Sequence, residues 1–487
     1  MSKWLKLKDP TLFKQQCFIR GQWCDADDAR SESVKNPATG EVIGTAPYLG
    51  TTETRRAIEA ASGAFGAWRK NSAKERAQLM RAWFDLMMAN QEDLAQILTA
   101  EGGKPLAEAR GEIAYGASFI EWFAEEGKRV YGDVIAHPQA DKRILVFKQP
   151  VGVCAAITPW NFPNAMITRK IGPALAAGCT VVCKPASQTP YSALAIAELA
   201  RRAGIPAGVI NVVTGNTRAI GDELCGNAIV RKLTFTGSTE VGRLLMEKCA
   251  PTLKKLSMEL GGNAPFIVFD DADLDAAVEG CIASKFRHAG QTCVCANRIY
   301  VQQGVLDTFS VKLAARIAQF KVGHGVDEGV TIGPLIDGKA VAKVEEHITD
   351  AVARGAKVLA GGKRHALGGN FFEPTLITGV TKAMKIAREE TFGPVAPLFP
   401  FGTVDEVLNL ANATEYGLAA YFYSRDLARV FRVAEELETG IVGVNVGIIS
   451  TEVGPFGGVK QSGFGREGSK YGIEDYLDKK YVCIGGM

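Results

Sequence analysis

The stretch VRKLTFTGSTEVGRLLMEKCA, residues 230–250, changes its pattern at a glycine. Its first half is a short apolar and β-branched run that ends at Gly237, and its second half repeats apolar residues at the three- and four-residue intervals of a helix. A strand, a glycine turn and a helix in this order predict one step of a parallel β-α-β unit. Because the first amides of such a helix are free, Gly237 and Ser238 form either a phosphate site or an ordinary strand-to-helix turn.

Short apolar runs alternate with helical patterns on both sides of this stretch. Upstream, the apolar runs are VGVCAAITPW at 151–160, CTVVCKPAS at 179–187 and VINVVTG at 209–215. Downstream, they are APFIVF at 264–269, NRIYVQQG at 297–304, GAKVLAGG at 355–362 and GIVGVNVG at 440–447. This alternation predicts two α/β domains in tandem, built from parallel strands, with a boundary near 259–265. An all-helical block is predicted over 52–130.

Composition limits the class of partner and the location. The 487 residues carry 56 Lys and Arg against 53 Asp and Glu, and no long basic run is present, so neither nucleic acid nor a membrane is a predicted partner. The apolar run at 171–183 is too short to cross a bilayer, and the N-terminus lacks the apolar core of a signal peptide. Eleven cysteines without paired spacing favour reduced thiols. We therefore expect a cytoplasmic protein that binds a small molecule.

Lys184 and Ser187 directly follow the predicted strand at 179–183. In an open α/β sheet, nucleotides bind at the carboxyl ends of the strands, so this position suits a cofactor. A lysine and a hydroxyl suit the 2′-phosphate of NADP, whereas a carboxylate at Ser187 would repel it, and the pair therefore favours NADP over NAD. The alternative is a solvated loop lysine without a ligand.

Glu259 stands between two apolar residues and ahead of a pair of glycines in LSMELGGNAP, residues 256–265. Apolar neighbours should raise the pKa of its carboxyl, which suits a general base near neutrality. The glycines would let another group approach the backbone closely. The alternative is a paired or exposed surface carboxylate.

Cys293 lies in FRHAGQTCVC, residues 286–295, between a helical pattern and a predicted strand. A metal site would need further Cys or His pairs at ligand spacing, which the chain lacks, so no metal is predicted. His288 is so near in sequence that a catalytic pair with Cys293 would be a coincidence of local spacing. A nucleophile, a buried thiol and a disulfide with Cys295 stay open at this point.

Seven motifs occur in one order along the chain: TPWNFP, KPASQTP, FTGSTEVG, ELGGNAP, GQTCVCANR, EETFGP and PFGGVKQSGFGRE. Together they resemble the aldehyde dehydrogenase superfamily over essentially the whole sequence. The resemblance implies a Rossmann-like cofactor domain over 1–132 and 151–258 and a second α/β domain, the catalytic one, over 259–470. It also implies a small β element for oligomerisation from 133–150 and 471–487, and hence a homo-oligomer, either a dimer or a tetramer.

By the resemblance, Cys293 is the nucleophile that attacks the aldehyde carbon and Glu259 the general base that hydrolyses the resulting thioester. Asn161 is the matching oxyanion-hole residue, which would act together with the backbone amide of Cys293. The cofactor-contact positions are Trp160, Lys184, Ser187, Gly237, Ser238, Leu260, Glu390 and Phe392. The expected cofactor is NADP, with NAD possible but weaker.

Within the superfamily, NFPNAMITRK, KFRHAGQTCVCANR and the end of the chain are most similar to the succinate-semialdehyde dehydrogenases. The resemblance implies oxidation of succinate semialdehyde to succinate, with Arg169, Arg287 and Ser450 holding the substrate carboxylate. The alternative for both arginines is pairing with protein carboxylates. Rival functions are the same chemistry on another carboxylated aldehyde such as glutarate semialdehyde, a thiol hydrolase that uses no nicotinamide, and a non-catalytic binding protein.

Cys295 lies two residues after the expected nucleophile. In a mobile loop the two thiols would come close enough for a disulfide, which would be strained and would switch the protein off under oxidising conditions. The alternative is a small buried residue at the start of the next strand.

Overall fold

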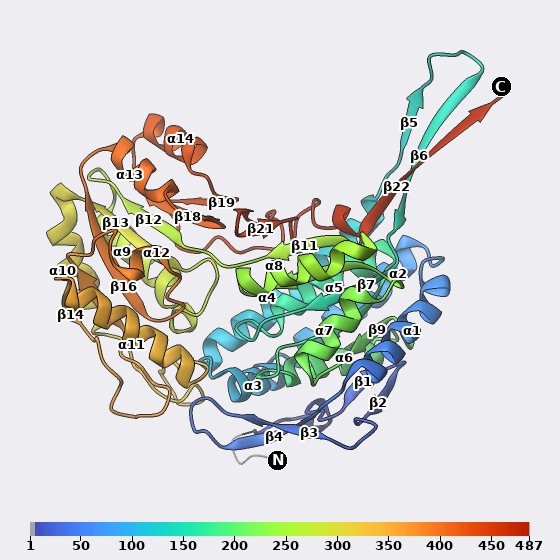
Figure 1. Cartoon of the computed structure of the whole chain (residues 1–487), viewed down its shortest axis with the longest axis horizontal. Coiled ribbons are helices and arrows are strands. Elements are labelled where there is room, and N and C mark those ends of the chain that lie inside the picture. Colours follow the sequence, from blue (N-terminus) through green and yellow to red (C-terminus); the bar gives the residue numbers. More distant parts are fainter. Residues whose placement is uncertain (1–4, 487) are drawn as a thin grey trace.

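An eight-stranded sheet forms the centre of the first lobe in the computed structural model, which describes residues 5–486 (Figure 1). In spatial order its strands are β2 (Gln22–Cys24), β1 (Cys17–Ile19), β9 (Ile210–Val212), β8 (Thr180–Lys184), β7 (Val153–Ile157), β10 (Val230–Thr236), β11 (Lys255–Glu259) and β21 (Gly463–Phe464). The five strands from β9 to β11 are parallel. The chain runs outward from β7 in one direction through β8 and β9 and in the other through β10 and β11. The crevice at this switch point, beyond the carboxyl ends of β7 and β10, is where such sheets bind ligands.

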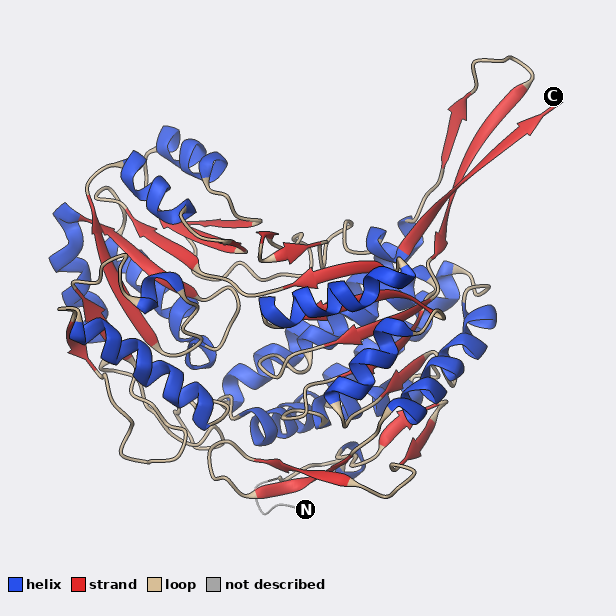
Figure 2. Cartoon of the chain, viewed as in Figure 1, coloured by secondary structure: helices blue, strands red, loops and turns tan. Residues whose placement is uncertain are grey.

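Helices cover both faces of this sheet (Figure 2). The helices of the lobe are α1 (Thr51–Trp68), α2 (Ala73–Ala89), α3 (Gln91–Gly102), α4 (Leu106–Glu126), α5 (Ala165–Ala177), α6 (Tyr191–Arg202), α7 (Thr217–Gly226) and α8 (Thr239–Cys249). Successive side chains of β7 enter different cores: Val153 and Ala155 pack with α1, α7 and α8, whereas Cys154 and Ala156 pack with α2 to α6. The period of two is that of a strand buried on both faces.

A seven-stranded sheet forms the second lobe. In spatial order its strands are β14 (Lys357–Ala360), β15 (Thr375–Thr378), β16 (Val395–Phe401), β13 (Ala296–Gln302), β12 (Ala264–Val268), β18 (Ala419–Tyr423) and β19 (Ile441–Val444). The helices around it are α9 (Leu274–Phe286), α10 (Leu306–Ile317), α11 (Gly338–Ala353), α12 (Lys385–Arg388), α13 (Val404–Asn412) and α14 (Leu427–Glu436). All strands except β14 are parallel to their neighbours. One apolar core joins this sheet to its helices.

A narrow three-stranded sheet projects from the first lobe as an arm (Figure 1). It contains β5 (Asp133–Ala136), β6 (Lys142–Pro150) and β22 (Leu477–Gly485), with β6 in the middle. The long register between β6 and β22 runs from the pair Pro150 and Leu477 to the pair Lys142 and Gly485. Large apolar side chains on the arm are exposed, among them Val134, Phe147 and Tyr481. An exposed apolar sheet of this kind is typical of a surface that another molecule covers.

Two small antiparallel pairs of strands complete the fold. One is a hairpin of β3 (Ser31–Lys35) and β4 (Val42–Pro47), and the other pairs β17 (Tyr416–Gly417) with β20 (Val459–Lys460), which follows later in the chain. Within residues 5–486, no helix combines the length and the apolar character that crossing a membrane requires.

The predicted alternation of parallel strands and helices is confirmed in both lobes, and α1 to α4 confirm the helical block. The β3 and β4 hairpin and α7 were not among the expected elements. The expected domain boundaries stay a prediction; β21, which falls inside the range expected for the catalytic domain, pairs with β11 in the first sheet. Gly463 makes this pairing possible, since a Cβ there would collide with the carbonyl oxygen of Met258.

Candidate active site

Cys293 follows a tight reversal of the chain between α9 and β13. His288 and Ala289 adopt left-handed backbone angles, with φ of 50° and 53°, and Gly290 continues the turn at 75°. Gln291 locks the loop, because its Nε2 donates to the carbonyl of His288 at 3.1 Å and its Oε1 accepts from the amide of Ile336 at 2.9 Å. These contacts fix the backbone that carries the candidate nucleophile.

The glycine pair after Glu259 packs against the same loop. A Cβ on Gly262 would lie 2.5 Å from the carbonyl oxygen of Cys293, so a larger residue would push the two segments apart. The close approach expected at this pair is therefore confirmed. It brings the end of β11, and with it Glu259, to the neighbourhood of Cys293.

Asn161 lies between β7 and α5 and is buried. Its side-chain Nδ2 donates to the carbonyl of Gln291 at 2.9 Å, and its own carbonyl accepts from Nζ of Lys104 at 3.0 Å. The side-chain amide therefore faces the cysteine loop and retains a second N–H for a further acceptor. The structure brings Asn161 and Cys293 into one site from segments far apart in the sequence.

Glu259 ends β11 with its carboxyl group buried. Neither of its oxygens has a hydrogen-bond partner in the described part of the chain. Burial raises the pKa of Glu259 well above its usual value, the charge of Glu467 raises it further, and Arg169 acts in the opposite direction. The raised pKa predicted from the sequence is confirmed, and its main cause is the expected loss of solvent.

The thiol of Cys293 lies in a small cavity beside the three proposed substrate residues. Arg169, Arg287 and Ser450 line this cavity together with the nucleophile, and so do Tyr115, Phe162, Met166, Thr292, Val294 and Phe456. Burial raises the pKa of Cys293 to about 12, and the charge of Arg169 opposes that effect. A substrate group held by the arginines would therefore place its reacting carbon near the sulfur.

A larger cavity of about 250 Å³ adjoins the small one. The two share the wall residues Tyr115, Phe162, Arg287 and Ser450, and the larger cavity adds Lys104, Glu108, Gly111 and Glu112. The shared wall shows that the two cavities are neighbours and that the larger one borders α4. Its volume is sufficient for a short aliphatic aldehyde.

The two arginines differ in their partners. Arg169 forms a buried ion pair with Glu467, with Nη2 2.7 Å from Oε2, and its guanidinium lies 3.9 Å from the centre of the Phe456 ring. This contact matches the alternative expected for Arg169. Arg287 stacks over Phe162 at 5.3 Å, and no carboxylate among residues 5–486 forms an ion pair with it. Of the two arginines, only Arg287 therefore has no ion-pair partner among residues 5–486, although the charge of Arg287 acts on the buried carboxyl of Glu108 in the same cavity.

Four charged residues of the site were missed from the sequence. Lys104 forms a buried ion pair with Glu112, and Glu112 also accepts from the amide of Asn164 at 3.0 Å, so the pair supports the segment of Asn161. Lys170 donates to Thr236 Oγ1 at 2.6 Å and contacts Glu467. Lys104 and Glu112 occupy ordinary polar positions of a helical pattern and carry no local signal. Glu467 is the last residue of a recognised motif, PFGGVKQSGFGRE, but its partners Arg169 and Lys170 are far away in the sequence, so nothing local indicated its role.

The candidate cofactor residues gather at the carboxyl ends of β7, β8, β10 and β11. Ser238 caps α8 by accepting from the amide of Val241 at 3.4 Å, which leaves the start of the helix open for an anion. Gly242 packs closely on Leu260, because a Cβ there would lie 2.5 Å from the end of the Leu260 side chain. Thr158, at the end of β7, has a buried hydroxyl without a partner in the described chain. The close packing at Gly242, the start of α8 and the free hydroxyl of Thr158 fit a dinucleotide.

Lys184 is buried at the end of β8, with an exposed fraction of 3%. The interpretation of it as a solvated loop lysine is therefore wrong. Burial lowers the pKa of Lys184 to about 8, and its Nζ donates to the carbonyl of Pro185 at 3.1 Å. Ser187 follows in the loop and lines a cavity of its own, described below.

Glu390 and Phe392 reach the site from the second lobe. Burial raises the pKa of Glu390 to about 7, although the amide of Gly262 donates to its Oε1 at 3.2 Å. Phe392 has a left-handed backbone, with φ of 54°, and its ring meets that of Trp160 edge to face at 5.6 Å. The two residues thus face Trp160 and Gly262 across the crevice between the lobes.

Cys295 is buried, and its thiol donates to the carbonyls of Lys285 at 3.3 Å and Ala296 at 3.6 Å. All eleven cysteines are free thiols. The contacts of Cys295 match the packing role, and a disulfide with Cys293 stays a prediction. Among the described residues, no group of His, Cys, Asp and Glu side chains is arranged to hold a metal ion.

Comparison with known proteins gives one consistent result. Residues 23–482 match the family described as the aldehyde dehydrogenase family. The chain is 68% identical over 480 residues to a glutarate-semialdehyde dehydrogenase of Pseudomonas putida, covering 99% of this chain and 100% of that protein. It is 66% identical over 481 residues to a succinate-semialdehyde dehydrogenase of Escherichia coli whose name specifies NADP(+), covering 99% and 100%. A crystal structure of an E. coli NADP dependent enzyme is similar over 99% of this chain and 100% of that chain, with 66% identity and a TM-score of 0.98.

Proposed function

The chain belongs to the aldehyde dehydrogenase family and is an oxidoreductase, and from this premise we propose that it oxidises succinate semialdehyde to succinate with NADP(+). The observation that carries the proposal is the position of Arg287. Its guanidinium lines both cavities next to Cys293 and forms no ion pair with a carboxylate among residues 5–486. A substrate whose far end is a carboxylate would supply that partner through paired, charge-assisted hydrogen bonds.

The substrate carboxylate would bind to Arg287 and the hydroxyl of Ser450, which share one cavity wall. Arg169 would add its positive charge from the wall of the small cavity, although Glu467 already neutralises part of it. Because Arg287, Ser450 and Cys293 line the same small cavity, an aldehyde with few carbons between its two ends should fit best. The carboxylate then fixes the orientation of the aldehyde toward Cys293.

The reaction would begin with attack of the Cys293 sulfur on the aldehyde carbon, which forms a thiohemiacetal. The charges of Arg169 and Arg287 lower the pKa of the thiol against the effect of burial and so favour the thiolate. Asn161 Nδ2 and the backbone amide of Cys293 would hold the oxygen as it becomes an alkoxide. The thioester that follows would be hydrolysed by a water molecule that Glu259 deprotonates.

NADP would supply the hydride acceptor for this chemistry when bound. Lys184, Ser187, Gly237, Ser238 and the start of α8 would hold its adenosine and phosphate groups. Trp160, Leu260, Glu390 and Phe392 would orient its nicotinamide half toward Cys293. The close packing of Gly242 on Leu260 and the name of the E. coli relative support this assignment.

Glutarate semialdehyde is the second candidate substrate. It has the same two functional groups, and the 68% identical P. putida relative carries its name. The cavity of about 250 Å³ adjoining the small one has space for one more carbon. Because the family consists of oxidoreductases, neither a hydrolase without nicotinamide nor a non-catalytic binding protein is supported.

We further propose that the arm joins copies of the chain into a dimer or a tetramer in the cytoplasm. Exposed Val134, Phe147 and Tyr481 would be covered by a second copy, and the free cysteines fit a reducing compartment. Replacement of Phe147 and Tyr481 by charged residues should reduce the molecular mass measured by light scattering. An unchanged mass would show that the arm does not hold the assembly.

The production of NADPH from a panel of aldehydes tests the proposed activity. The panel contains succinate semialdehyde, glutarate semialdehyde and butanal, each with NADP and with NAD. We expect the highest kcat/KM for succinate semialdehyde with NADP and a much lower one for butanal. A higher value for glutarate semialdehyde would assign that substrate instead, and equal values for butanal would contradict recognition of the carboxylate.

A further inference from the structure

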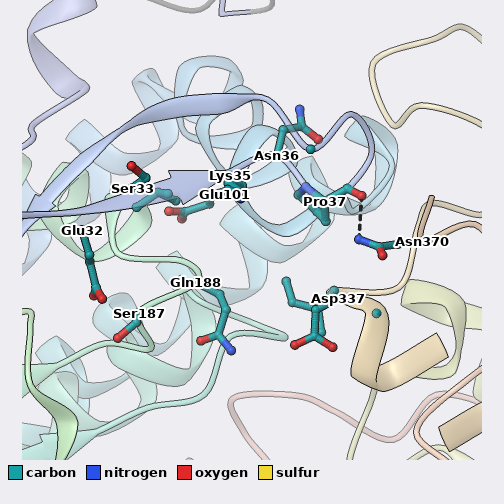
Figure 3. A pocket seen from close by; sticks show the side chains of 14 residues that line it. Glu32, Ser33, Lys35, Asn36, Pro37, Glu101, Ser187, Gln188, Asp337 and Asn370 are labelled. Atoms are coloured by element: carbon teal, nitrogen blue, oxygen red, sulfur yellow. Dashed lines mark hydrogen bonds between the residues drawn. The ribbon is translucent and has the colours of Figure 1, made fainter. Parts of the chain in front are cut away.

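A cavity of about 340 Å³ lies between the β3 and β4 hairpin, the loop after β8 and the start of α11 (Figure 3). We call it the hairpin pocket. Ser187 and Gln188 line it from the β8 loop, Asp337 from the second lobe, and Glu32 from β3. The hairpin was not an expected part of the cofactor site, yet it faces the residue that the sequence assigned to the 2′ position of the cofactor.

Three carboxylates line the hairpin pocket, and two of them accept hydrogen bonds from backbone amides. The oxygens of Glu101 accept from the amides of Tyr191 and Ser192 at 2.7 and 2.8 Å. Asp337 caps α11, with Oδ1 accepting from the amides of Lys339 and Ala340 at 3.0 and 2.9 Å. These hydrogen bonds satisfy backbone donors at helix starts and give both carboxylates a role in the fold.

Glu32 is the third carboxylate, and unlike the other two its side chain does not accept hydrogen bonds from amides at the start of a helix. Its Oε1 is buried without a hydrogen-bond partner among residues 5–486, and no lysine or arginine there forms an ion pair with it. Figure 3 shows its carboxylate pointing toward the loop of Ser187. Its charge also acts on Lys184. Burial lowers the pKa of Lys184, and the charge of Glu32 is the largest of the effects that raise that pKa. An acceptor of this kind lacks a donor that a ligand would provide.

We propose that Glu32 sets the balance between the two nicotinamide cofactors. Its free oxygen accepts a hydrogen bond from the adenosine ribose hydroxyl of NAD, and its charge repels the 2′-phosphate of NADP. The affinity for NADP therefore exceeds that for NAD by a smaller factor than Lys184 and Ser187 alone would give. A carboxylate that binds the ribose hydroxyl is the usual device of NAD-binding sites, and a second negative charge beside a phosphate is unfavourable. Here the carboxylate would come from the N-terminal hairpin instead of from the sheet.

This inference rests on the proposed use of a nicotinamide dinucleotide, and binding without turnover can test it. Purified full-length wild type, Glu32→Gln and Asp28→Asn are each titrated with NADPH and with NADH in the absence of aldehyde, with quenching of tryptophan fluorescence as the signal. Asp28→Asn is the matched control, because it removes one negative charge from the same segment at an exposed ion pair with Arg30. Glu32→Ser serves as a second variant, and thermal unfolding verifies that each protein is folded.

In Glu32→Gln we expect the Kd for NADPH to fall about fivefold, as for removal of a like charge in partly screened surroundings. The Kd for NADH should rise about fivefold to tenfold, as for loss of one hydrogen bond to a charged group. High salt should reduce the NADPH effect. Asp28→Asn should leave both values within about twofold, as is usual for a surface charge pair.

Two results would overturn the inference in different ways. If wild type binds NADPH or NADH but the ratio of the two Kd values is the same in Glu32→Gln, Glu32→Ser and wild type, Glu32 has no part in cofactor choice while the proposed function stands. If wild type binds neither nucleotide, the proposed cofactor fails, and the inference fails with it.

Discussion

Arg169 and Glu467 form an ion pair in the protein interior, with Nη2 2.7 Å from Oε2. The contact joins α5 to the segment after β21, and Lys170 contacts the same carboxylate. The charges of this cluster act on Glu259, whose pKa is raised by burial and by Glu467 and lowered by Arg169 and Lys170. These buried charges thereby influence the pKa of the candidate base.

Arg169→Ala should destabilise the protein. The change leaves the buried charge of Glu467 with one partner fewer, and breaking a buried pair in this way costs about 3–5 kcal/mol. Denaturant unfolding should show the loss as a lower midpoint. Arg287→Ala is the control, because Arg287 lacks an ion pair in the described chain, and it should unfold close to wild type. Equal stability of the two variants would mean that the pair of Arg169 and Glu467 contributes little.

Arg287→Ala should weaken recognition of the substrate carboxylate. Loss of a hydrogen bond between charged groups is expected to cost about 1.5–3 kcal/mol and so to raise KM for succinate semialdehyde by about tenfold or more. Butanal, which has no carboxylate, is the matched control and should lose far less. If KM rises by the same factor for both aldehydes, Arg287 supports the fold of the loop and does not bind the substrate carboxylate.

Glu259→Gln should allow one turnover and then stop. The thioester can still form on Cys293, but no base is left to activate the water that hydrolyses it. Rapid mixing with NADP and substrate should show a burst of NADPH close to the enzyme concentration, followed by a slow phase. Cys293→Ala should show no burst while it retains cofactor binding. Steady turnover of Glu259→Gln would remove Glu259 from this role.

The rate of hydrolysis should rise with pH through the raised pKa of Glu259. A base acts in its ionised form, so activity is lost as the pH falls below that pKa, and the acidic limb of the profile lies well above the range of an ordinary glutamate. Lys170→Gln removes a charge that lowers this pKa, and the limb should therefore move to higher pH. A limb that stays in place, or moves down, would show that another group controls the profile.

Mild peroxide tests the relationship between Cys293 and Cys295. A disulfide between them predicts that wild type loses activity, contains a bridged peptide and recovers with dithiothreitol, whereas Cys295→Ala continues to irreversible oxidation. The hydrogen bonds of the Cys295 thiol to the carbonyls of Lys285 and Ala296 oppose this, because they direct the sulfur into the core. Mass spectrometry without a bridged peptide, or identical recovery of both proteins, would leave Cys295 with a packing role.

The sequence was informative where a function depends on the end of a strand or on one glycine. Glu259 could be predicted with its raised pKa because its apolar neighbours and the following glycines are local, and the parallel strands followed from their spacing. Residues that act through contacts across the fold could not be found in this way. Arg169 was expected to face the substrate, but its partner Glu467 lies at the far end of the chain. Glu32 belongs to a hairpin that has no recognised motif.

The order of strands in the arm affects how the protein is made. β6 lies between β5, which precedes it closely, and β22, which begins only at Leu477. At translation rates of about 5–20 residues per second, a ribosome needs tens of seconds to make the residues between them. Throughout that time one edge of β6 has no partner from its own chain, and the strands that complete both lobes, up to β21, are made in the same interval. The arm is therefore among the last parts of the nascent protein to close, and any assembly through it must follow synthesis of that final strand.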